Sequence, residues 1–292
     1  MTARRLSSVI RPERCCILHG GPGGWPFDPI AKQLGDALWI DISETPRDYN
    51  YLLFVDQFDE SNCGELFISL QSMRWAADKR LLAERFATHG VPTPQTFLVD
   101  SLDEAHHIRL THPQIEWCLK YPTGCGASGH RMLTDGMTLP KSWPHPLIVQ
   151  EFIRMPRPEV YRLYGAGHEL FGWIARRFPD GAKTSEWVAH ARGARYQRVG
   201  EPPIEAMNAA RSALEAVELF DTFGCVDLLQ RSSGEWVVLE VGTDGLFNHV
   251  DRELDVAELE TELQRRIAEA FWTPIGWRPW GDGEWVPRTA TF

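Results

Sequence analysis

The stretch from Asp227 to Gly245 constrains the fold of this chain more than any other part of the sequence. Two apolar runs flank a Ser-Ser-Gly sequence, which predicts two short strands joined by a turn at Ser232–Gly234. Each strand carries one acid within its apolar run, Asp227 in the first and Glu240 in the second. An ionised carboxylate among Val and Leu is costly unless a cation or hydrogen bonds compensate it, and two such groups across a hairpin repel each other.

A hard metal ion near the two acids is the simplest compensation. Proteins commonly hold Mg²⁺ with one or two carboxylates together with the phosphates of a substrate, so this hairpin predicts a magnesium site at Asp227 and Glu240. The alternative is an ordinary surface hairpin whose two acids face the solvent. The residues of the hairpin alone are compatible with both interpretations.

The composition limits the class of protein and its partners. The chain has 292 residues and a formal net charge of −10, so we expect a large core and no general nucleic-acid binding, which requires a basic surface. No segment is apolar over the length of a bilayer, and no signal peptide is recognisable, so no membrane partner is expected. The six cysteines form no Cys-x-x-Cys pair, which favours reduced thiols in a cytoplasmic protein.

A group of arginines stands out from this acidic background. Such a group is typical either of a positively charged site or of a solvated sheet face, and the sequence leaves both interpretations open. The group comprises Arg154, Arg157, Arg162, Arg176, Arg177, Arg192, Arg195 and Arg198.

The order of the predicted elements divides the chain into three lobes and a tail. Short apolar runs at 14–19, 37–42 and 51–55 favour a small α/β lobe with parallel strands. The next part alternates helices and strands around a glycine-rich loop at Thr123–His130, and the third is an antiparallel α+β unit that ends in a helix at Val256–Phe271. We expect these lobes to surround a cleft. The predicted boundaries are 1–75 for the α/β lobe, 76–150 and 151–271 for the two following lobes, and 272–292 for an irregular Trp- and Pro-rich tail.

Three local predictions concern the connections in this scheme. One continuous helix is expected over Ser72–His89, with Gly90 as its stop signal. Ser101 is expected to cap a helix over Leu102–Leu110, and Pro179–Arg195 lacks periodicity and is expected to be a long loop.

Several short motifs occur in a characteristic order along the chain. They are Asp78-Lys79, the glycine-rich run Leu119–Gly129, Val149–Ile153, Glu159, Arg176-Arg177, and Asp227 followed 13 positions later by Glu240. On these motifs, the chain from about Ser72 to Phe271 resembles the ATP-grasp superfamily of carboxylate–amine ligases. It looks most like the branch that includes the ribosomal-protein glutamate ligase and peptide-modifying enzymes. The resemblance implies an ATP-grasp fold of mixed α/β and α+β class, with a small N-terminal α/β lobe and two α+β lobes that sandwich ATP.

The predicted nucleotide site combines a flexible loop with two lysines. Glycines at 124, 126 and 129 permit positive φ, so backbone N–H groups can point at phosphate oxygens. Lys120 ends a predicted buried strand, where a lysine must either extend to the surface or meet an anion. The resemblance implies contacts of both lysines with phosphate, of the backbone near Phe152 with adenine, and of Glu159 with ribose. The implied ATP-binding residues are Lys79, Lys120, Gly124, Gly126, Ser128, Gly129, Glu151, Phe152, Ile153 and Glu159.

The resemblance also implies a metal site and catalytic arginines. Glu240 would bridge two Mg²⁺ ions and Asp227 would hold one of them. The family's usual asparagine two residues after the glutamate is replaced here by Gly242, for which Thr243, Asp244 or Asn248 are candidate substitutes. Together with Lys120, Arg176 or Arg177 would stabilise an acyl phosphate; strand alternation places these two arginines on opposite faces.

The implied activity is ATP-dependent formation of an amide or peptide bond between a carboxylate, activated as an acyl phosphate, and an amine. The substrates would be small amino acids or peptides, held by Arg162, Trp187 and Arg192, with Lys183–Arg195 as a lid. A kinase on the same fold and a catalytically impaired nucleotide-binding module are the alternatives. The oligomeric state stays open, with a homodimer as one option because dimers are common in the family.

A further alternative comes from the N-terminal sequence. The run His19–Gly24 is similar to the oxyanion loop of some α/β-hydrolases. That interpretation requires a Gly-x-Ser-x-Gly motif, which this chain lacks.

Overall fold

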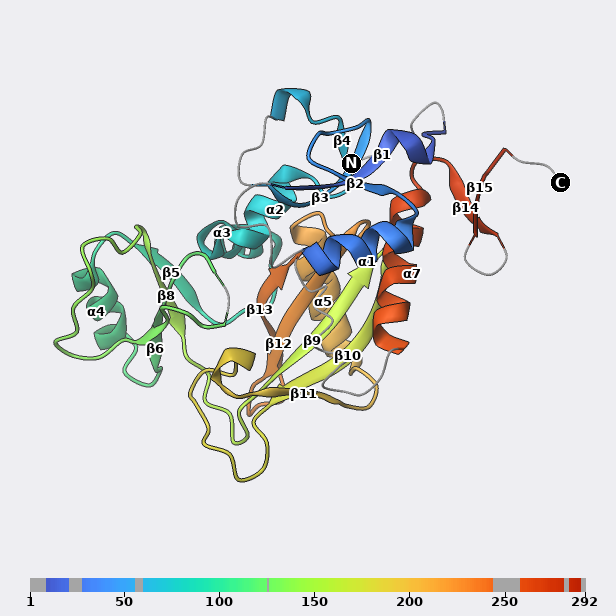
Figure 1. Ribbon diagram of the computed structural model, residues 1–292. Coiled ribbons are helices and arrows are strands. Elements are labelled where there is room, and N and C mark those ends of the chain that lie inside the picture. Colours follow the sequence, from blue (N-terminus) through green and yellow to red (C-terminus); the bar gives the residue numbers. More distant parts are fainter. Residues whose placement is uncertain are drawn as a thin grey trace.

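The computed structural model describes residues 9–20, 28–55, 60–124, 126–243, 258–280 and 284–289. Within these residues the strands form three larger sheets and a C-terminal hairpin (Figure 1). The glycine-rich run predicted at the end of the first strand lies, from residue 21 onward, outside the described residues. None of the helices in the described part of the chain has the length and apolar character needed to cross a membrane.

The first sheet is parallel, with the order β2-β1-β3-β4. Helix α1 (Asp28–Leu38) packs its apolar face against this sheet, and the predicted strand at 37–42 begins only at Asp41 because Leu38 belongs to that helix face. The remaining elements of this part are η1 (Pro12–Arg14), β1 (Cys15–Gly20), β2 (Asp41–Ser43), β3 (Tyr49–Val55), η3 (Glu60–Asn62) and β4 (Glu65–Leu66).

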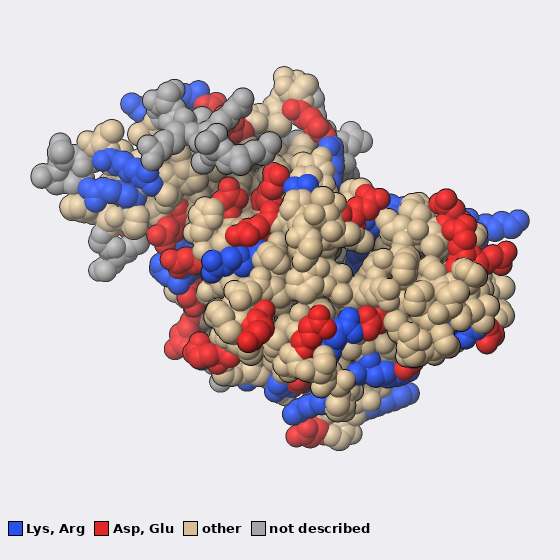
Figure 2. Space-filling model, turned by 180° about the vertical axis from the view of Figure 1, so that it is seen from behind, with Lys and Arg blue, Asp and Glu red and all other residues tan. Residues whose placement is uncertain are grey.

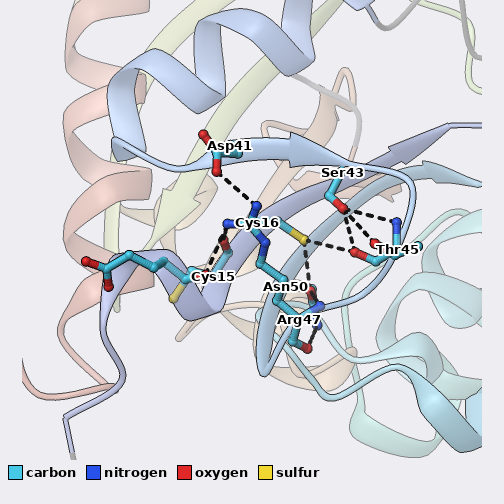
Figure 3. A network of polar contacts seen from close by, with 8 residues as sticks. Cys15, Cys16, Asp41, Ser43, Thr45, Arg47 and Asn50 are labelled. Carbon is cyan, nitrogen blue, oxygen red and sulfur yellow. Dashed lines mark hydrogen bonds and ion pairs between the residues drawn. The ribbon is translucent and has the colours of Figure 1, made fainter.

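A buried asparagine holds the turn that leads into β3 (Figure 3). The Asn50 Oδ1 atom accepts hydrogen bonds from the Cys16 thiol at 3.0 Å and from the Arg47 backbone N–H at 2.7 Å. Its amide nitrogen donates to the carbonyl oxygens of Arg47 and Cys63. Since the side chain is fully buried and fully paired, it links β1, the turn and the start of β4 into one unit.

Two helices replace the single helix that the sequence predicts over Ser72–His89. Helix α2 (Leu70–Ala77) and helix α3 (Lys79–His89) are separated by Asp78, whose backbone is extended at φ −109° and ψ 112°. The Asp78 carboxylate accepts the backbone N–H of Arg80 and pairs with its guanidinium, so it caps α3 instead of continuing α2. The predicted stop at Gly90 is confirmed, with a left-handed φ of 65°.

The second sheet is antiparallel, with the order β5-β8-β6-β7, and has a small core of its own around Trp117, Leu119 and Val149. Ser101 caps α4 as predicted, by accepting the Glu104 backbone N–H. The elements of this part are β5 (Thr96–Val99), α4 (Leu102–Thr111), β6 (Trp117–Lys120), β7 (Arg131–Met132) and β8 (Leu147–Glu151).

The third sheet is antiparallel, with the order β11-β10-β9-β12-β13, and contains the predicted acid hairpin. Helix α5 (Ile204–Ala216) packs closely on it, because Leu214 occupies the space that a side chain at Gly165 or Gly224 would need. The segment predicted as a loop contains only a short turn, η4 (His190–Arg192), before the edge strand. The strands are β9 (Glu159–Ala166), β10 (Glu169–Arg177), β11 (Arg195–Arg198), β12 (Phe223–Gln230) and β13 (Trp236–Gly242).

Helix α7 (Glu258–Trp272) joins the first and third sheets into one core (Figure 1). The Phe271 ring lies 4.8 Å from the ring of Tyr49 and 5.5 Å from that of Phe67, between centroids. The second sheet keeps a separate core. Residues of the first and third predicted lobes therefore share one continuous core. The boundaries of the predicted lobes stay predictions.

The tail is not irregular, as predicted from its Trp and Pro content, but forms a hairpin of β14 (Trp277–Trp280) and β15 (Glu284–Pro287). The Trp277 indole N–H donates to the carbonyl of Ile10 at 2.8 Å, and Trp277 and Trp285 pack against the main core. Prolines are tolerated here because both strands of a two-stranded hairpin are edge strands.

A candidate active site between two sheets

A cavity of about 500 Å³ lies between the second and third sheets. Strands β6 and β8 form one wall, strands β9, β10, β12 and β13 the other, and the segment 186–191 closes one side. Because the walls come from stretches that are far apart in the sequence, the cavity brings together most of the residue types that the sequence marks as functional.

The deepest charge in this cavity is Asp227 on β12, whose side chain is 2% exposed. Arg162 stands directly opposite on β9 and donates from Nε to Oδ1 at 2.7 Å and from Nη2 to Oδ2 at 3.2 Å. Arg176 on β10 donates from Nη2 to Oδ2 at 2.8 Å. Burial by itself would raise the pKa of Asp227, but the charges of the two arginines lower this pKa below its ordinary range, so the carboxylate is ionised.

Glu240 lies opposite Asp227 across the hairpin, as predicted, and has different surroundings. Its side chain is 39% exposed, and the Lys79 ammonium is 3.8 Å away. In chemistry and accessibility it fits an ion that is shared with substrate phosphates. Asp227 fits such an ion less well, because three guanidinium N–H groups already occupy its oxygens.

Of the three candidate substitutes for the third protein ligand, Thr243 is the one that lies within the described residues. Gly242 and Thr243 line a small adjoining pocket, whereas Asp244 and Asn248 lie outside the described residues. Within the described ranges, no group of three or more His, Cys, Asp or Glu side chains could hold a metal ion. The assignment of Asp227 and Glu240 to a metal stays a prediction.

Two lysines approach the cavity from the side of the second sheet. Lys120 ends β6, is 8% exposed and lines the cavity, and burial lowers the pKa of its ammonium. No carboxylate of the described residues lies within 4 Å of its Nζ atom. Lys79 donates to the carbonyl of Gly124 at 2.9 Å. A buried ammonium without a close carboxylate favours an anionic ligand.

The glycine-rich loop has the backbone that the sequence predicts. Gly124, Gly126 and Gly129 have φ of 85°, 67° and 77°. At Gly129 a side chain would also be excluded by space, since a Cβ atom would lie 3.0 Å from that of Tyr121. Ser128 lies on this loop and is exposed. The contacts of these residues with phosphate stay predictions.

The residues assigned to the nucleoside divide into two groups. Phe152 and Ile153 line the cavity, while the Phe152 N–H donates to the carbonyl of Glu116 at 2.7 Å. Glu151 lines the cavity too, but its carboxylate pairs with the Arg231 guanidinium. Glu159 pairs with Arg177 and is not among the described residues that line the cavity.

The two adjacent arginines face different ways, as strand alternation predicts. Arg176 lines the cavity, whereas Arg177 contacts Glu159 and the hydroxyl of Tyr161. Of the two candidates for catalysis, Arg176 is therefore the one that lies beside the buried acid.

The other arginines of the group are split between the site and the surface. Arg154 pairs with Glu116 at 2.8 Å, and Arg198 pairs with Glu258 at 3.2 Å, both with exposed partners. The face seen in Figure 2 likewise carries acidic and basic side chains close together. Arg162 and Arg176 thus belong to a positively charged site, whereas Arg154 and Arg198 are solvated surface residues.

The segment predicted as a lid contacts both ends of the cavity. The Trp187 ring lies 5.0 Å from that of Phe152 and 5.5 Å from that of His130, between centroids. Arg192 donates to the carbonyl of Ala127 in the glycine-rich loop at 3.4 Å. This segment therefore bridges the residues assigned to adenine and the loop assigned to phosphate.

Among the side chains of the cavity wall that sequence reasoning missed are those of His130 and Tyr196. His130 ends the glycine-rich loop and accepts the Tyr121 N–H through Nδ1 at 3.4 Å. Burial, followed by the charges of Lys120 and Lys79, lowers the pKa of His130 to about 3, so its ring is neutral. The Tyr196 ring lies 5.9 Å from the Arg176 guanidinium. In the sequence, the position of His130 directly after Gly129 is the one signal that could have placed it at the site.

The sequence matches the ATP-grasp domain family over residues 76–243. No curated protein sequence matches the chain. Among solved structures, that of the D-cycloserine synthetase DcsG is 18% identical, with a TM-score of 0.62 over 89% of this chain and 99% of the other.

Two other similar structures have the same fold at lower identity. The ATP-grasp ligase PsnB, complexed with a minimal precursor, is 13% identical with a TM-score of 0.61, over 88% of this chain and 99% of the other. The D-alanine–D-alanine ligase from Bacillus anthracis, complexed with ATP, is 13% identical with a TM-score of 0.62, over 91% of this chain and 97% of the other. At these identities the likeness concerns the fold.

Proposed function

The chain belongs to the ATP-grasp domain family, and from this premise we propose that it is an ATP-dependent carboxylate–amine ligase. The observation that carries the proposal is the single cavity that joins the buried ammonium of Lys120, the glycine-rich loop, Arg176 and the two acids of the hairpin. These positive groups suit a reaction in which a substrate carboxylate approaches the triphosphate of ATP, because they offset the repulsion between the two anions.

The proposed reaction has two steps. An oxygen of the substrate carboxylate attacks the γ-phosphorus of ATP, the bond to the bridging oxygen breaks, and ADP leaves with the electron pair. The nitrogen of an amine then attacks the acyl carbon, inorganic phosphate leaves, and the nitrogen loses a proton to give the amide.

The side chains of the cavity have distinct roles in this proposal. Phosphoryl transfer is catalysed mainly by alignment and by neutralising charge on the transferred group. Lys120 and the N–H groups of the glycine-rich loop bind phosphate oxygens, as Lys79 does from the start of α3. Arg176 and Arg162 orient the anionic acyl phosphate, and the segment 183–195, with Trp187 and Arg192, excludes water from it. Mg²⁺, when held by Glu240 and substrate phosphates, supplies further neutralisation of that charge.

The proposed substrates are a small-molecule or peptide carboxylate and an amine. In support, the named relatives include a D-cycloserine synthetase and a ligase complexed with a precursor peptide. The adenine and ribose roles of Glu151–Ile153 and Glu159, the cytoplasmic location and the homodimer stay predictions.

Mass spectrometry of ATP-dependent products tests this function. The protein is incubated with ATP, Mg²⁺ and a pool of metabolites and peptides. We expect products whose mass equals that of an acid plus an amine less one water, with one ADP and one phosphate released per product. Phosphorylated products formed without any amine would instead identify a kinase. ADP binding without turnover over the whole pool would identify a nucleotide-binding module, the alternative that Gly242 motivates.

A further inference from the structure

The surroundings of Asp227 differ from those that a two-ion site requires. The arrangement implied by the resemblance needs Asp227 to hold one Mg²⁺ ion and Glu240 to bridge two. A magnesium ligand must direct an oxygen lone pair at the ion, with near-octahedral geometry around it. In this chain both Asp227 oxygens face guanidinium N–H groups, at 2.7, 2.8 and 3.2 Å.

The arginine pair is part of the sheet and not a chance surface contact. Arg162 is the direct neighbour of Asp227 across the β9–β12 ladder, and Arg176 comes from β10, the next strand along. The side chains of both arginines are 14% exposed, and Asp227 is 2% exposed. An ion coordinated by Asp227 would lie close to two buried positive charges, and their repulsion opposes its binding there.

A second feature of the hairpin points the same way. The position two residues after Glu240 is Gly242, which offers no side-chain oxygen, and it lies in a strand of the sheet. Of the two protein positions that the resemblance places beside Glu240 in a two-ion site, Asp227 is therefore engaged by arginines, and position 242 carries no side chain. Glu240 itself is accessible, and the Lys79 ammonium lies 3.8 Å from its carboxylate.

We infer that the nucleotide-bound site takes a single divalent cation, at Glu240, and that Asp227 is a positioning residue that aims Arg162 and Arg176 at the transferred phosphoryl group. This inference rests on the proposed function. The two guanidinium groups and one carboxylate leave a net charge of about +1 beside the cavity, in the place where the second ion would act. Each guanidinium has five N–H donors, so both keep donors for phosphate oxygens while they hold Asp227.

Counting manganese ions by electron paramagnetic resonance tests this inference on the unmodified protein. Mn²⁺ is titrated into protein saturated with AMPPNP, a nucleotide whose γ-phosphate is not transferred, and free Mn²⁺ is measured from its signal. AMPPNP without protein corrects for binding to the nucleotide alone. We expect one Mn²⁺ per protein-bound nucleotide, and two ions per bound nucleotide would overturn the inference.

Two matched variants separate the roles of the acids. In Asp227→Asn we expect the ion count and the AMPPNP affinity to stay unchanged while kcat falls about 100-fold, because the arginines lose their anchor. In Glu240→Gln we expect the affinity for Mn²⁺ in the presence of AMPPNP to fall at least about tenfold. A drop in ion count or manganese affinity in Asp227→Asn would overturn the inference. If this variant does not fold, the count in the parent protein still decides.

The outcomes for this inference and for the proposed function are distinguishable. Two ions per nucleotide would overturn the single-ion inference and leave the ligase function standing. A parent protein that binds no AMPPNP at all would contradict both.

Discussion

At the scale of single residues, the cavity contains two buried charged side chains, Lys120 and Asp227, whose surroundings differ. Lys120 and Asp227 are both nearly inaccessible, yet among the described residues Lys120 has no carboxylate within ion-pair distance, whereas Asp227 has two guanidinium partners. A buried unpaired ammonium is costly without an anion, while a paired buried carboxylate is stable in its ionised form. This difference predicts that ligand binding depends on Lys120 and that alignment depends on Asp227.

Replacement of Glu240 tests the site that is open to a metal ion. We expect Glu240→Ala to reduce ATP-dependent phosphate release about 100-fold or more, since an accessible carboxylate in the cavity is lost together with the cation it holds. The free energy of unfolding, measured in urea, should equal that of the parent protein. Glu215→Ala, at an exposed position of α5, is the control and should retain parental release. Unchanged turnover in Glu240→Ala would remove the metal assignment.

Replacement of Lys120 tests the phosphate role. Lys120→Met keeps most of the buried volume and removes the charge, so we expect ADP affinity to fall about tenfold or more, or about 1.4 kcal/mol. Isothermal titration calorimetry measures this directly. Lys141→Met, at an exposed position, should bind ADP as the parent does. Equal affinity in Lys120→Met and the parent would refute the assignment.

The neutral ring of His130 predicts a pH dependence of stability. The pKa of His130 is lowered to about 3, whereas a histidine in an unfolded chain titrates near about 6.5. Between these values the unfolded state binds a proton that the folded state does not, so this residue makes the protein less stable as the pH falls below about 6.5.

Urea unfolding at about pH 7 and about pH 5 measures this contribution. We expect His130→Gln to lose less unfolding free energy between the two pH values than the parent loses. His107→Gln, at an exposed position of α4, serves as control and should keep the parental difference. The same pH dependence in His130→Gln and the parent would contradict the prediction.

At the scale of elements, the site depends on segments that meet at their ends. The break at Asp78 starts α3 at Lys79, beside the glycine-rich loop, where the Lys79 backbone N–H donates to the carbonyl of Pro122 at 2.9 Å. In a continuous helix, the Lys79 backbone N–H would be bonded within the helix and could not reach Pro122. The segment 183–195 reaches the same loop from the third sheet through Arg192. The glycine-rich loop and the segment proposed as a lid are thus in contact without a ligand.

The lid predicts a loss of coupling when Trp187 is removed. Trp187→Ala deletes the ring that contacts both His130 and Phe152, so water should reach the acyl phosphate more easily. We expect the ratio of phosphate released to amide formed to rise severalfold above one. Phosphate assay and product mass spectrometry together give this ratio. Trp39→Ala, which removes a 53% exposed ring, should keep parental coupling, and a parental ratio in Trp187→Ala would argue against the lid.

At the scale of the whole molecule, two cores of unequal size meet at the cavity. The first and third sheets share one core through α7, whereas the second sheet has its own. A cavity between separate cores can change its width without repacking either core. The proposed nucleotide site thus lies between two parts of the molecule that have separate cores.

The shared core makes a prediction for Phe271. Phe271→Ala removes a fully buried ring between Tyr49 and Phe67 and should cost about 3–5 kcal/mol of unfolding free energy. Hydrogen exchange should show faster exchange in the first and third sheets and parental exchange in the second. Leu110→Ala, at a 70% exposed position, should stay within about 0.5 kcal/mol of the parent. Uniform acceleration over all three sheets would show that the cores are not independent.

The sequence alone determined those features whose cause is local. The acid hairpin follows from two apolar runs and a turn, and Asp227 does face Glu240 in the ladder. The positive φ of Gly124 and the stop at Gly90 follow from residues without a Cβ atom. The ATP-grasp family could be recognised because such local features occur in a characteristic order.

Only the tertiary structure decided which side chains surround the acids. Arg162 and Arg176 are 65 and 51 residues away from Asp227 in the sequence, and they meet it because β10, β9 and β12 are neighbours in the sheet. The break at Asp78 and the hairpin in the tail likewise involve distant segments, because the Lys79 N–H donates to Pro122 and the Trp277 indole donates to Ile10. Strand order and register set these contacts, and neither is encoded in the spacing of residues along one strand.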